Sequence, residues 1–157
     1  MTPMSIARAR KKAVADPAGP IPYLLEEQVG FLLRCAHQSA TEDFNAVMGR
    51  FAITPTQFAA LAKLDDLGSV SQNQLGRLTR MDPATISGVV GRLIARGLVC
   101  QSPHAHDARL VLLALTPSGR TVVREMKAIA AQVSRRTLGR LSPAEADALL
   151  LALAKIG

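Results

Sequence analysis

The sequence predicts a mainly α-helical fold in which two short helices and a β hairpin form a winged helix-turn-helix. Three observations lead to this prediction. The 157 residues are 48% hydrophobic but only 3% aromatic, with no Trp, which indicates a helical core rich in Leu and Ala. Apolar residues recur at helical spacing behind residues that commonly begin helices. Two leucine-rich or β-branched runs then flank a polar segment, as in a hairpin.

The chain begins with a segment that carries no helical signal. Residues 1–20 mix Ala, Arg, Lys, Gly and Pro without apolar periodicity, and this predicts a flexible basic arm. From Pro22 to about residue 50 we expect one long amphipathic helix. Its main apolar stripe consists of Leu25, Val29, Leu32, Ala36, Ala40, Phe44 and Val47. A second stripe covers another side, so part of this helix is expected to pack against another subunit.

The next helix is predicted from its ends. Thr54-Pro55 combines an N-cap with a first-position proline, and Gln57 completes a capping box. Gly68 supplies the C-terminal cap. Asp65 and Asp66 lie just before this end, and without a third ligand at suitable spacing we interpret them as solvated residues rather than a metal site.

Two short helices follow, at Ser71–Leu78 and at Asp82–Arg96. Ser71 and Gln74 have capping-box spacing, and Asp82-Pro83 is an N-cap followed by proline. Gly97 can end the second helix in a left-handed conformation. The inward stripe of this helix is Ile86, Val89, Val90 and Leu93. Its opposite face is small and hydroxylated, with Arg92 and Arg96 towards the end, and could approach a nucleic-acid groove.

The wing is expected from Leu98–Ser102 and Leu110–Leu115, with residues 103–109 as a long polar tip. His104 and His106 lie in this tip, but no Cys or third His is near them. We therefore favour an exposed polar wing over a zinc site.

Two further helices are predicted after the wing. Thr116-Pro117 caps the first, and Ser142 with Glu145 forms a capping box for the second. Their apolar surface exceeds what a small wing can cover. Together with the first long helix they are therefore expected to form the interface of a homodimer.

The charge of the chain favours a polyanionic partner. The formal net charge is +7, and residues 70–120 hold six Arg and two Asp but no Lys. Because this excess coincides with helix-turn-helix spacing, we predict binding to double-stranded DNA rather than a merely solvated basic surface. On this interpretation the N-terminal arm is either an inert tail or a segment that lies along the DNA backbone.

The sequence does not support other classes of protein. The sequence has no Gly-rich phosphate loop, metal constellation or Ser, His and acid set in a recognisable context, so no enzyme is predicted. Cys35 and Cys100 do not make a disulfide framework, and no hydrophobic run approaches the roughly 20 residues that span a bilayer. We expect a cytoplasmic protein of the bacterial cytosol, nucleoid-associated when bound to DNA, with no cofactor, metal or membrane partner.

Three segments resemble the MarR family of bacterial transcription regulators: TPTQFAALAKL from Thr54, SQNQLGRLTRMDPATISGVVGRLIARGLV from Ser71, and HDARLVLLALTPSG from His106. The most specific parts are Arg-Gly-Leu-Val at 96–99, Asp-x-Arg at 107–109 and Leu-Thr-x-x-Gly at 115–119. Weaker similarity covers residues 23–155. The resemblance implies one MarR-like domain at 21–157, with a DNA-binding lobe at about 54–116 and dimerisation helices at about 22–50 and 117–156.

The resemblance and the residue chemistry together predict which residues contact DNA. The expected DNA is a palindromic operator, bound by the dimer. Base edges would be met by Pro83, Ala84, Thr85, Ser87 and Gly88, and the DNA backbone by Gln72, Gln74, Arg77, Arg80 and Arg92, with Ser71 beside them. Family members often carry Arg where this chain has Gly88, so specificity is expected to rest partly on DNA shape.

Two of the expectations have plain alternatives. Arg109, oriented by Asp107, would enter the minor groove as the matching family residues do, or the two would form a surface ion pair. Gly88 and Gly91 each cost about 1 kcal/mol inside a helix, which indicates either close approach to DNA or tight helix packing.

The family also implies an effector. Members commonly respond to small aromatic acids, and Arg34, His37 and Gln38 on the first helix could hold an anionic ligand or be ordinary surface or interface residues. The chain as a whole is similar to members that control nicotinate breakdown and respond to hydroxynicotinate. The predicted function is a homodimeric repressor of a catabolic or efflux operon, released by such an acid. The rival is a redox-sensing repressor that uses Cys35 or Cys100.

Overall fold

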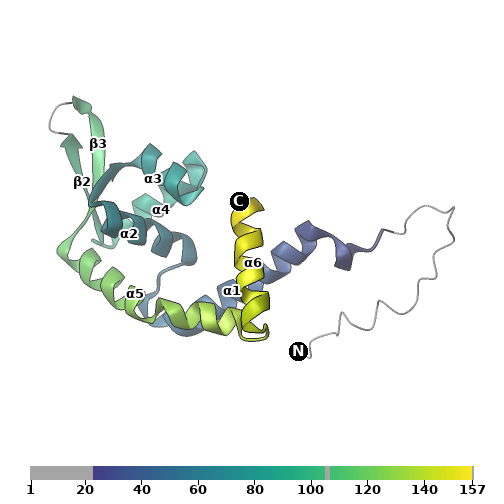
Figure 1. Ribbon diagram of the computed structural model, residues 1–157. Helices are drawn as coiled ribbons and strands as arrows, with labels where there is room; N and C mark the ends of the chain where they lie inside the picture. The colour runs from purple at the N-terminus through teal and green to yellow at the C-terminus, as the bar shows by residue number, and fades with distance from the viewer. Residues whose placement is uncertain (1–22, 105–106, 157) are drawn as a thin grey trace, which may run out of the picture. The chain divides into compact units, whose positions relative to one another are not determined.

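The computed structural model describes residues 23–104 and 107–156, except the side chains at 104 and 107–110 (Figure 1). The chain divides within its first long helix, after Cys35, into two units. The elements in order are η2 (Leu25–Glu27), α1 (Val29–Met48), η3 (Gly49–Phe51), α2 (Pro55–Leu67), β1 (Ser69–Ser71), α3 (Gln72–Thr79), α4 (Pro83–Ala95), β2 (Val99–His104), β3 (Asp107–Leu115), α5 (Pro117–Leu138) and α6 (Pro143–Ile156). None of the described helices is both long and apolar enough to cross a membrane.

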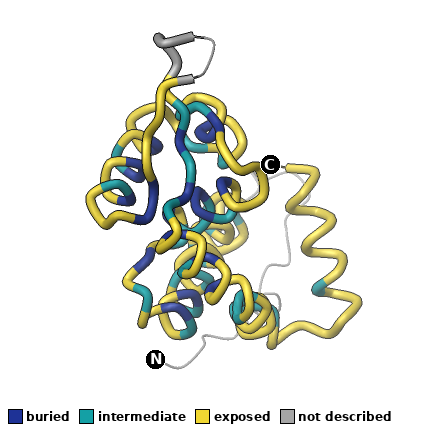
Figure 2. Tube along the Cα trace, turned by 90° about the vertical axis from the view of Figure 1, so that its left-hand side faces the viewer, coloured by how far each residue is buried: buried dark blue, intermediate teal, exposed yellow. Residues whose placement is uncertain are grey.

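One hydrophobic core holds the second unit together. Its members come from the end of α1, from α2, α3 and α4, from the sheet and from the first half of α5: Phe44, Met48, Ile53, Ala60, Leu61, Leu64, Val70, Leu75, Ile86, Val89, Val90, Leu93, Leu98, Val99, Leu113, Leu115, Val123 and Met126. The buried segments in Figure 2 follow this set. The predicted inward stripe of α4 is confirmed, since all four of its residues belong to this core.

The sheet contains one strand more than the predicted hairpin. Its order is β1-β3-β2, and both pairings are antiparallel. The strand β1 has three residues between the cap of α2, Gly68, and the N-cap of α3, Ser71, and its Val70 pairs with Leu113. The hairpin is thereby fixed along one edge to the helix-turn-helix, because β1 leads directly into α3.

The long polar tip expected at 103–109 is wrong in its extent. The strand β2 continues through His104 and β3 begins at Asp107, so only residues 105–106 stand between them. Pro103 pairs with Val111 inside the ladder, and the register shifts between Pro103 and His104. Because β2 is an edge strand, the missing amide proton of a proline is tolerated there, which the sequence pattern alone did not indicate.

The first long helix also begins later than expected. In place of one helix from Pro22, the described chain has the short 3-10 helix η2, the extended residue Gln28, and α1 from Val29. Of the predicted apolar stripe only Phe44 is buried, whereas Val29 is 65% exposed. The predicted arm at residues 1–20 lies outside the described residues.

The predicted capping boxes are confirmed at two positions and half formed at a third. Thr54 and Gln57 form the full capping box of α2, and Gly68 ends that helix with a φ of 80°. Ser142 and Glu145 bond reciprocally before α6, since the Ser142 amide donates to Oε2 of Glu145 at 2.8 Å. The box expected at Ser71 is only half formed, because its hydroxyl accepts the Gln74 amide proton without a reciprocal bond.

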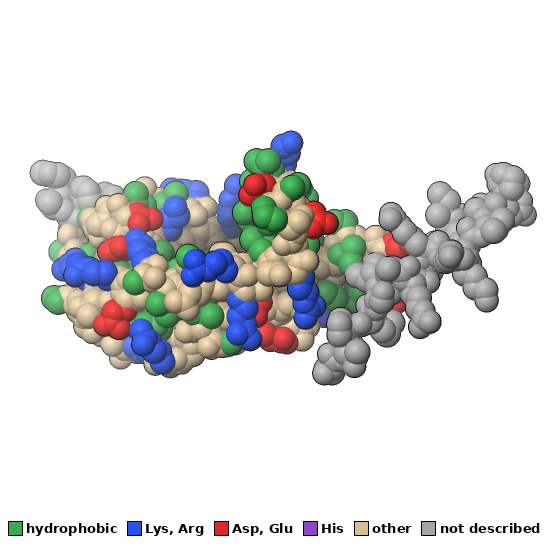
Figure 3. All heavy atoms as spheres, turned by 60° about the horizontal axis from the view of Figure 1, so that its bottom comes forward, with side chains coloured by type: hydrophobic (Ala, Val, Ile, Leu, Met, Phe, Trp, Pro, Cys, Tyr) green, Lys and Arg blue, Asp and Glu red, His purple; other side chains and the backbone are tan. Residues whose placement is uncertain are grey.

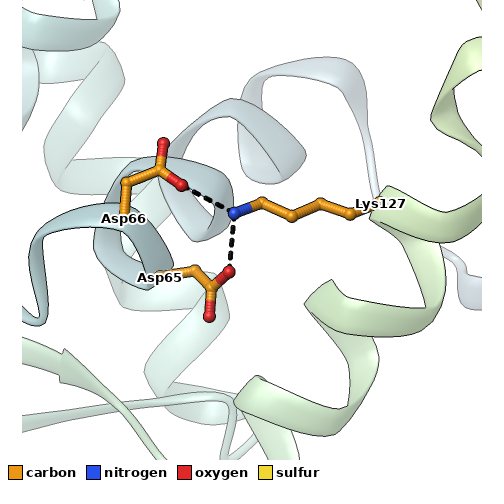
Figure 4. A network of polar contacts seen from close by, with 3 residues as sticks. All are labelled: Asp65, Asp66 and Lys127. Atoms are coloured by element: carbon orange, nitrogen blue, oxygen red, sulfur yellow. Dashed lines mark hydrogen bonds and ion pairs between the residues drawn. The ribbon is translucent and has the colours of Figure 1, made fainter.

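Asp65 and Asp66 are not the merely solvated residues that the sequence suggested. Nζ of Lys127 on α5 lies 2.6 Å from Oδ2 of Asp65 and 2.7 Å from Oδ1 of Asp66 (Figure 4). The hydrogen bond from Lys127 lowers the pKa of Asp66, and bonds to both carboxylates, that of Asp65 first, raise the pKa of Lys127. These three residues, here called the α2–α5 clamp, join the end of α2 to the middle of α5.

Candidate nucleic-acid interface

The turn between α3 and α4 brings the two helices close together. Arg80 adopts the left-handed conformation with a φ of 55°, and the Met81 amide donates to the Gly76 carbonyl at 2.9 Å. A Cβ at Gly76 would lie only 3.2 Å from Cγ2 of Ile86. Gly76 therefore permits the close crossing that sets the position of α4 against α3.

The N-terminus of α4 is fixed by Asp82. Its Oδ1 accepts the amide protons of Ala84 and Thr85 at 3.0 and 2.9 Å, and its Oδ2 accepts the Thr85 hydroxyl proton at 2.6 Å. The bond from that hydroxyl is the main cause that lowers the pKa of Asp82. Since the Thr85 hydroxyl proton is already donated to Asp82, the Thr85 oxygen is left as an acceptor, which suits the amino groups of adenine and cytosine.

The outer face of α4 is open and carries the residues predicted to meet base edges. Pro83, Ala84, Thr85 and Ser87 are exposed and Gly88 is half-buried. The packing alternative for the two glycines gains no support from neighbouring helices. A Cβ at Gly91 would have nothing within 4 Å, and one at Gly88 would meet only the Arg92 guanidinium, at 3.4 Å or more.

The polar residues of α3 and the turn flank this face. Gln74, Arg77 and Arg80 are exposed, while Ser71 and Gln72 are half-buried. A shallow hollow of about 330 Å³ lies between α3 and α4, lined by Asn73, Gly76, Arg77, Met81, Pro83 and Ile86. The structure thus brings the helix-turn-helix residues of the prediction onto adjoining parts of one surface.

Arg96 has a different role from the one that its place at the end of the helix suggested. Its guanidinium donates to the backbone carbonyls of Ala52 and Phe51, the latter at 2.9 Å. Ala52 is one of two non-glycine residues in the described chain with a positive φ, 50°. Arg96 therefore holds the connection between η3 and α2 against the end of α4. Sequence reasoning could not find this bond, because its partners are 44 and 45 residues away and are backbone atoms.

The structure describes the predicted wing residues only in part. The backbone of Asp107 and Arg109 belongs to β3, and Asp107 pairs with His104. The side chains of these three residues, and His106 as a whole, lie outside the described residues.

The residues expected to hold an effector lie on α1. Arg34, His37 and Gln38 are exposed, and the Arg34 guanidinium lies 5.3 Å from the ring centre of Phe31. Arg34 belongs to the unit before the division of the chain, and His37 and Gln38 belong to the unit after it.

The two thiols differ in their surroundings. Cys35 is half-buried on α1, and Cys100 is exposed on β2, where its sulfur lies 3.5 Å from the Ala114 carbonyl oxygen. Both are free.

The C-terminal helix leaves a large apolar surface uncovered in the single chain. None of the described residues of α6 is buried, and five of its large apolar side chains are between 39% and 67% exposed: Leu149, Leu150, Leu151, Leu153 and Ile156. Figure 3 shows hydrophobic side chains along this projecting helix. Such a surface on one protomer is typical of an interface with a second copy.

Comparison with known proteins connects these features to transcription regulation. The model of the MarR family matches residues 53–110. The repressor NicR of Pseudomonas putida is 41% identical over 140 residues, which cover 89% of each chain. A probable transcriptional regulator from Pseudomonas aeruginosa has a similar structure, with a TM-score of 0.82 and 43% identity over 85% of this chain and all of that one.

A further structural relative is BpsR of Bordetella bronchiseptica, whose DNA binding is regulated by 6-hydroxynicotinic acid. It has a TM-score of 0.81 and 41% identity, over 86% of this chain and 96% of its own.

Proposed function

The chain belongs to the MarR family of transcription regulators, which are not enzymes, and from this premise we propose that it is a homodimeric repressor of a catabolic operon. The dimer binds a palindromic operator and is released by a small aromatic carboxylate, for which 6-hydroxynicotinate is the first candidate. The observation that supports this choice of effector is the 41% identity to BpsR, whose DNA binding is regulated by that acid.

The proposed DNA contacts follow from the exposed surfaces of α3 and α4. The first turns of α4, from Pro83 to Gly88, lie in the major groove, where a recognition helix meets base edges. Gln72, Gln74, Arg77 and Arg80, with Ser71, contact the phosphates on either side. Arg109, oriented by Asp107, enters the minor groove from the wing, where the negative potential of a narrow groove attracts a guanidinium.

The proposed effector contacts are Arg34, His37 and Gln38. A carboxylate needs a cation or several donors, and a ring hydroxyl or ring nitrogen needs a donor or acceptor, which a His and a Gln supply. Release then requires that the acid bind the free dimer more tightly than the dimer on its operator. In the bacterial cytosol, which we propose as the location, the concentration of the acid would set how much of the operator is occupied.

The experiment that tests this function is footprinting of the purified protein on the DNA upstream of its own gene. We expect a protected palindrome that is lost on adding 6-hydroxynicotinate and is kept with nicotinate, the matched acid without the hydroxyl group. Protection that neither acid disturbs would reject the effector and keep the repressor. Absence of protection at any low salt concentration would reject the whole proposal.

The exposure of Cys100 favours one second candidate, a repressor released by oxidation. If acids leave the footprint unchanged, peroxide should abolish it, and a reductant should restore it. The Cys100→Ser and Cys35→Ser variants then identify the thiol. A footprint insensitive to peroxide rejects this candidate.

A further inference from the structure

The outer face of α4 carries one guanidinium, that of Arg92, for which the described residues offer no partner. Arg92 is exposed, and among the described residues it makes no hydrogen bond or ion pair. Arg96, one turn later, is by contrast bonded to two carbonyls. The five N–H donors of Arg92 therefore remain available for a ligand of the helix face.

The guanidinium of Arg92 lies beside Gly88. A Cβ at Gly88 would lie 3.4 Å from Nη1 and 3.6 Å from Nη2 of Arg92, so the side chain lies back along the helix instead of extending away from it. Long side chains on a helix lean towards its N-terminus, and residues four apart share one row. The residue one turn before Gly88 in this row is Ala84, which is also small.

The row from Ala84 to Arg92 thus brings a planar cation to the part of α4 that a recognition helix presents to base edges. If Arg92 contacted a phosphate, its side chain would not need to lie back along the helix. An extended arginine side chain reaches a phosphate equally well. A guanidinium has the fork geometry that matches O6 and N7 of guanine, and no other residue on the outer face of α4 between 83 and 91 carries such a group.

We infer that Arg92 is the guanine-reading residue of α4. This inference rests on the proposed function, since it assumes that α4 enters the major groove. It replaces the phosphate contact expected for Arg92 with a specificity-determining one. Because the dimer is two-fold symmetric, each half-site should contain one G·C pair at the same distance from the centre.

The test is selection of binding sequences from a random pool of duplexes with the wild-type protein, Arg92→Ala and Arg92→Lys. The wild type should select a symmetric sequence with a strong G at one position in each half. Arg92→Ala should lose the preference at that position alone. Arg92→Lys keeps the charge but not the paired N–H donors of the guanidinium, and it should also lose most of the preference for G at that position. Measured with pure duplexes, replacing this G·C pair in both halves should weaken wild-type binding by about 5- to 150-fold per half-site and Arg92→Ala binding by less than threefold.

A phosphate contact would give another pattern. Arg92→Ala would then weaken all duplexes equally, reduce the salt dependence by about one counterion, and leave the selected sequence unchanged. That result overturns the inference and keeps the proposed function. Arg77→Ala serves as the matched control for such a uniform loss, and thermal unfolding verifies that each variant is folded. A wild-type protein that selects no sequence would overturn both the inference and the proposed function.

Discussion

Arg92 on α4 and Arg96 at its C-cap stand one turn apart, and within the described part of the chain only Arg96 is bonded to other residues. Its two bonds tie the end of α4 to the residues before α2, including the left-handed Ala52. We therefore expect the two arginines to contribute to different properties of the molecule, Arg96 to stability and Arg92 to the proposed DNA binding.

We expect Arg96→Ala to lower the free energy of unfolding by about 1–3 kcal/mol, because two carbonyls lose a charged donor. Arg92→Ala should leave that free energy within about 0.5 kcal/mol of wild type, as for an exposed residue without partners. Urea denaturation followed by circular dichroism measures both. Equal losses in the two variants would mean that the bonds of Arg96 do not stabilise the fold.

Gly88→Ala should separate stability from DNA binding. Alanine gains about 0.5–1 kcal/mol over glycine inside a helix, and at this site a Cβ would meet only the end of a flexible side chain. The free energy of unfolding should therefore rise while operator affinity falls, because the helix can no longer approach the DNA as closely. Denaturation and fluorescence anisotropy with a labelled operator measure the two effects.

Gly119→Ala is the contrasting control for this prediction. A Cβ at Gly119 would lie 2.0 Å from the carbonyl oxygen of Leu98, which is backbone and cannot move aside cheaply. This variant should lose about 1–3 kcal/mol of stability or more. A gain of stability at Gly119, or a loss at Gly88, would contradict the packing described for these two helices.

At the scale of elements, the α2–α5 clamp should give stability a dependence on pH at both extremes. The pKa of Asp66 is lowered from its ordinary value of 3.8, so the clamp contributes above that value and is lost as pH falls through the folded pKa. The pKa of Lys127 is raised from 10.5, so its contribution is complete below that value and is lost as pH rises through the folded pKa.

Lys127→Met tests this expectation, since it keeps the aliphatic part of the side chain and removes the charge. The melting temperature of the variant should lie below that of wild type by a constant amount between about pH 5 and 9. The difference should shrink below pH 3.8 and again above pH 10.5. A difference that stays the same at pH 3 would mean that the ion pairs do not account for it.

The elements show which features a sequence can predict. Caps such as Thr54 with Gln57 were found because both partners lie within one turn, and the α4 stripe because helical spacing is local. The strand β1 was missed because three residues carry no periodicity. The clamp and the Arg96 bonds were missed because their partners are 44 to 62 residues apart.

The candidate site was predictable to a similar extent. The exposed residues of α3 and α4 followed from the helical spacing that also gave the core. The fold-back of Arg92 over Gly88 could not be read from the sequence, because an arginine side chain with several rotatable bonds can take many directions. The same freedom explains why Arg92 and Arg96 looked equivalent before their partners were known.

At the scale of the whole molecule, the exposed apolar surface of α6 is typical of an interface with a second copy of the chain. Leu150→Glu places a charge within this surface, at a side chain that is 53% exposed in the single protomer. We expect the variant to sediment as a monomer at concentrations where the wild type is a dimer, because burying an unpaired carboxylate is costly.

Operator affinity should then fall by more than tenfold, since a monomer holds only one half-site. Leu67→Glu is the matched control, because Leu67 at the end of α2 is 49% exposed and lies outside the proposed dimer helices. This control should remain a dimer. A Leu150→Glu protein that stays dimeric would place the interface elsewhere.

The helix α5 is attached at three points along its length. Gly119 rests against Leu98, Lys127 is held by α2, and the Arg136 Nε donates to Oδ1 of Asp43 on α1 at 2.7 Å. From Gly119 to Arg136 this is about 25 Å of uninterrupted helix. A helix anchored in this way has no hinge between its two ends. We therefore expect a tilt imposed at one end of α5 to be transmitted to the other end instead of being absorbed between them.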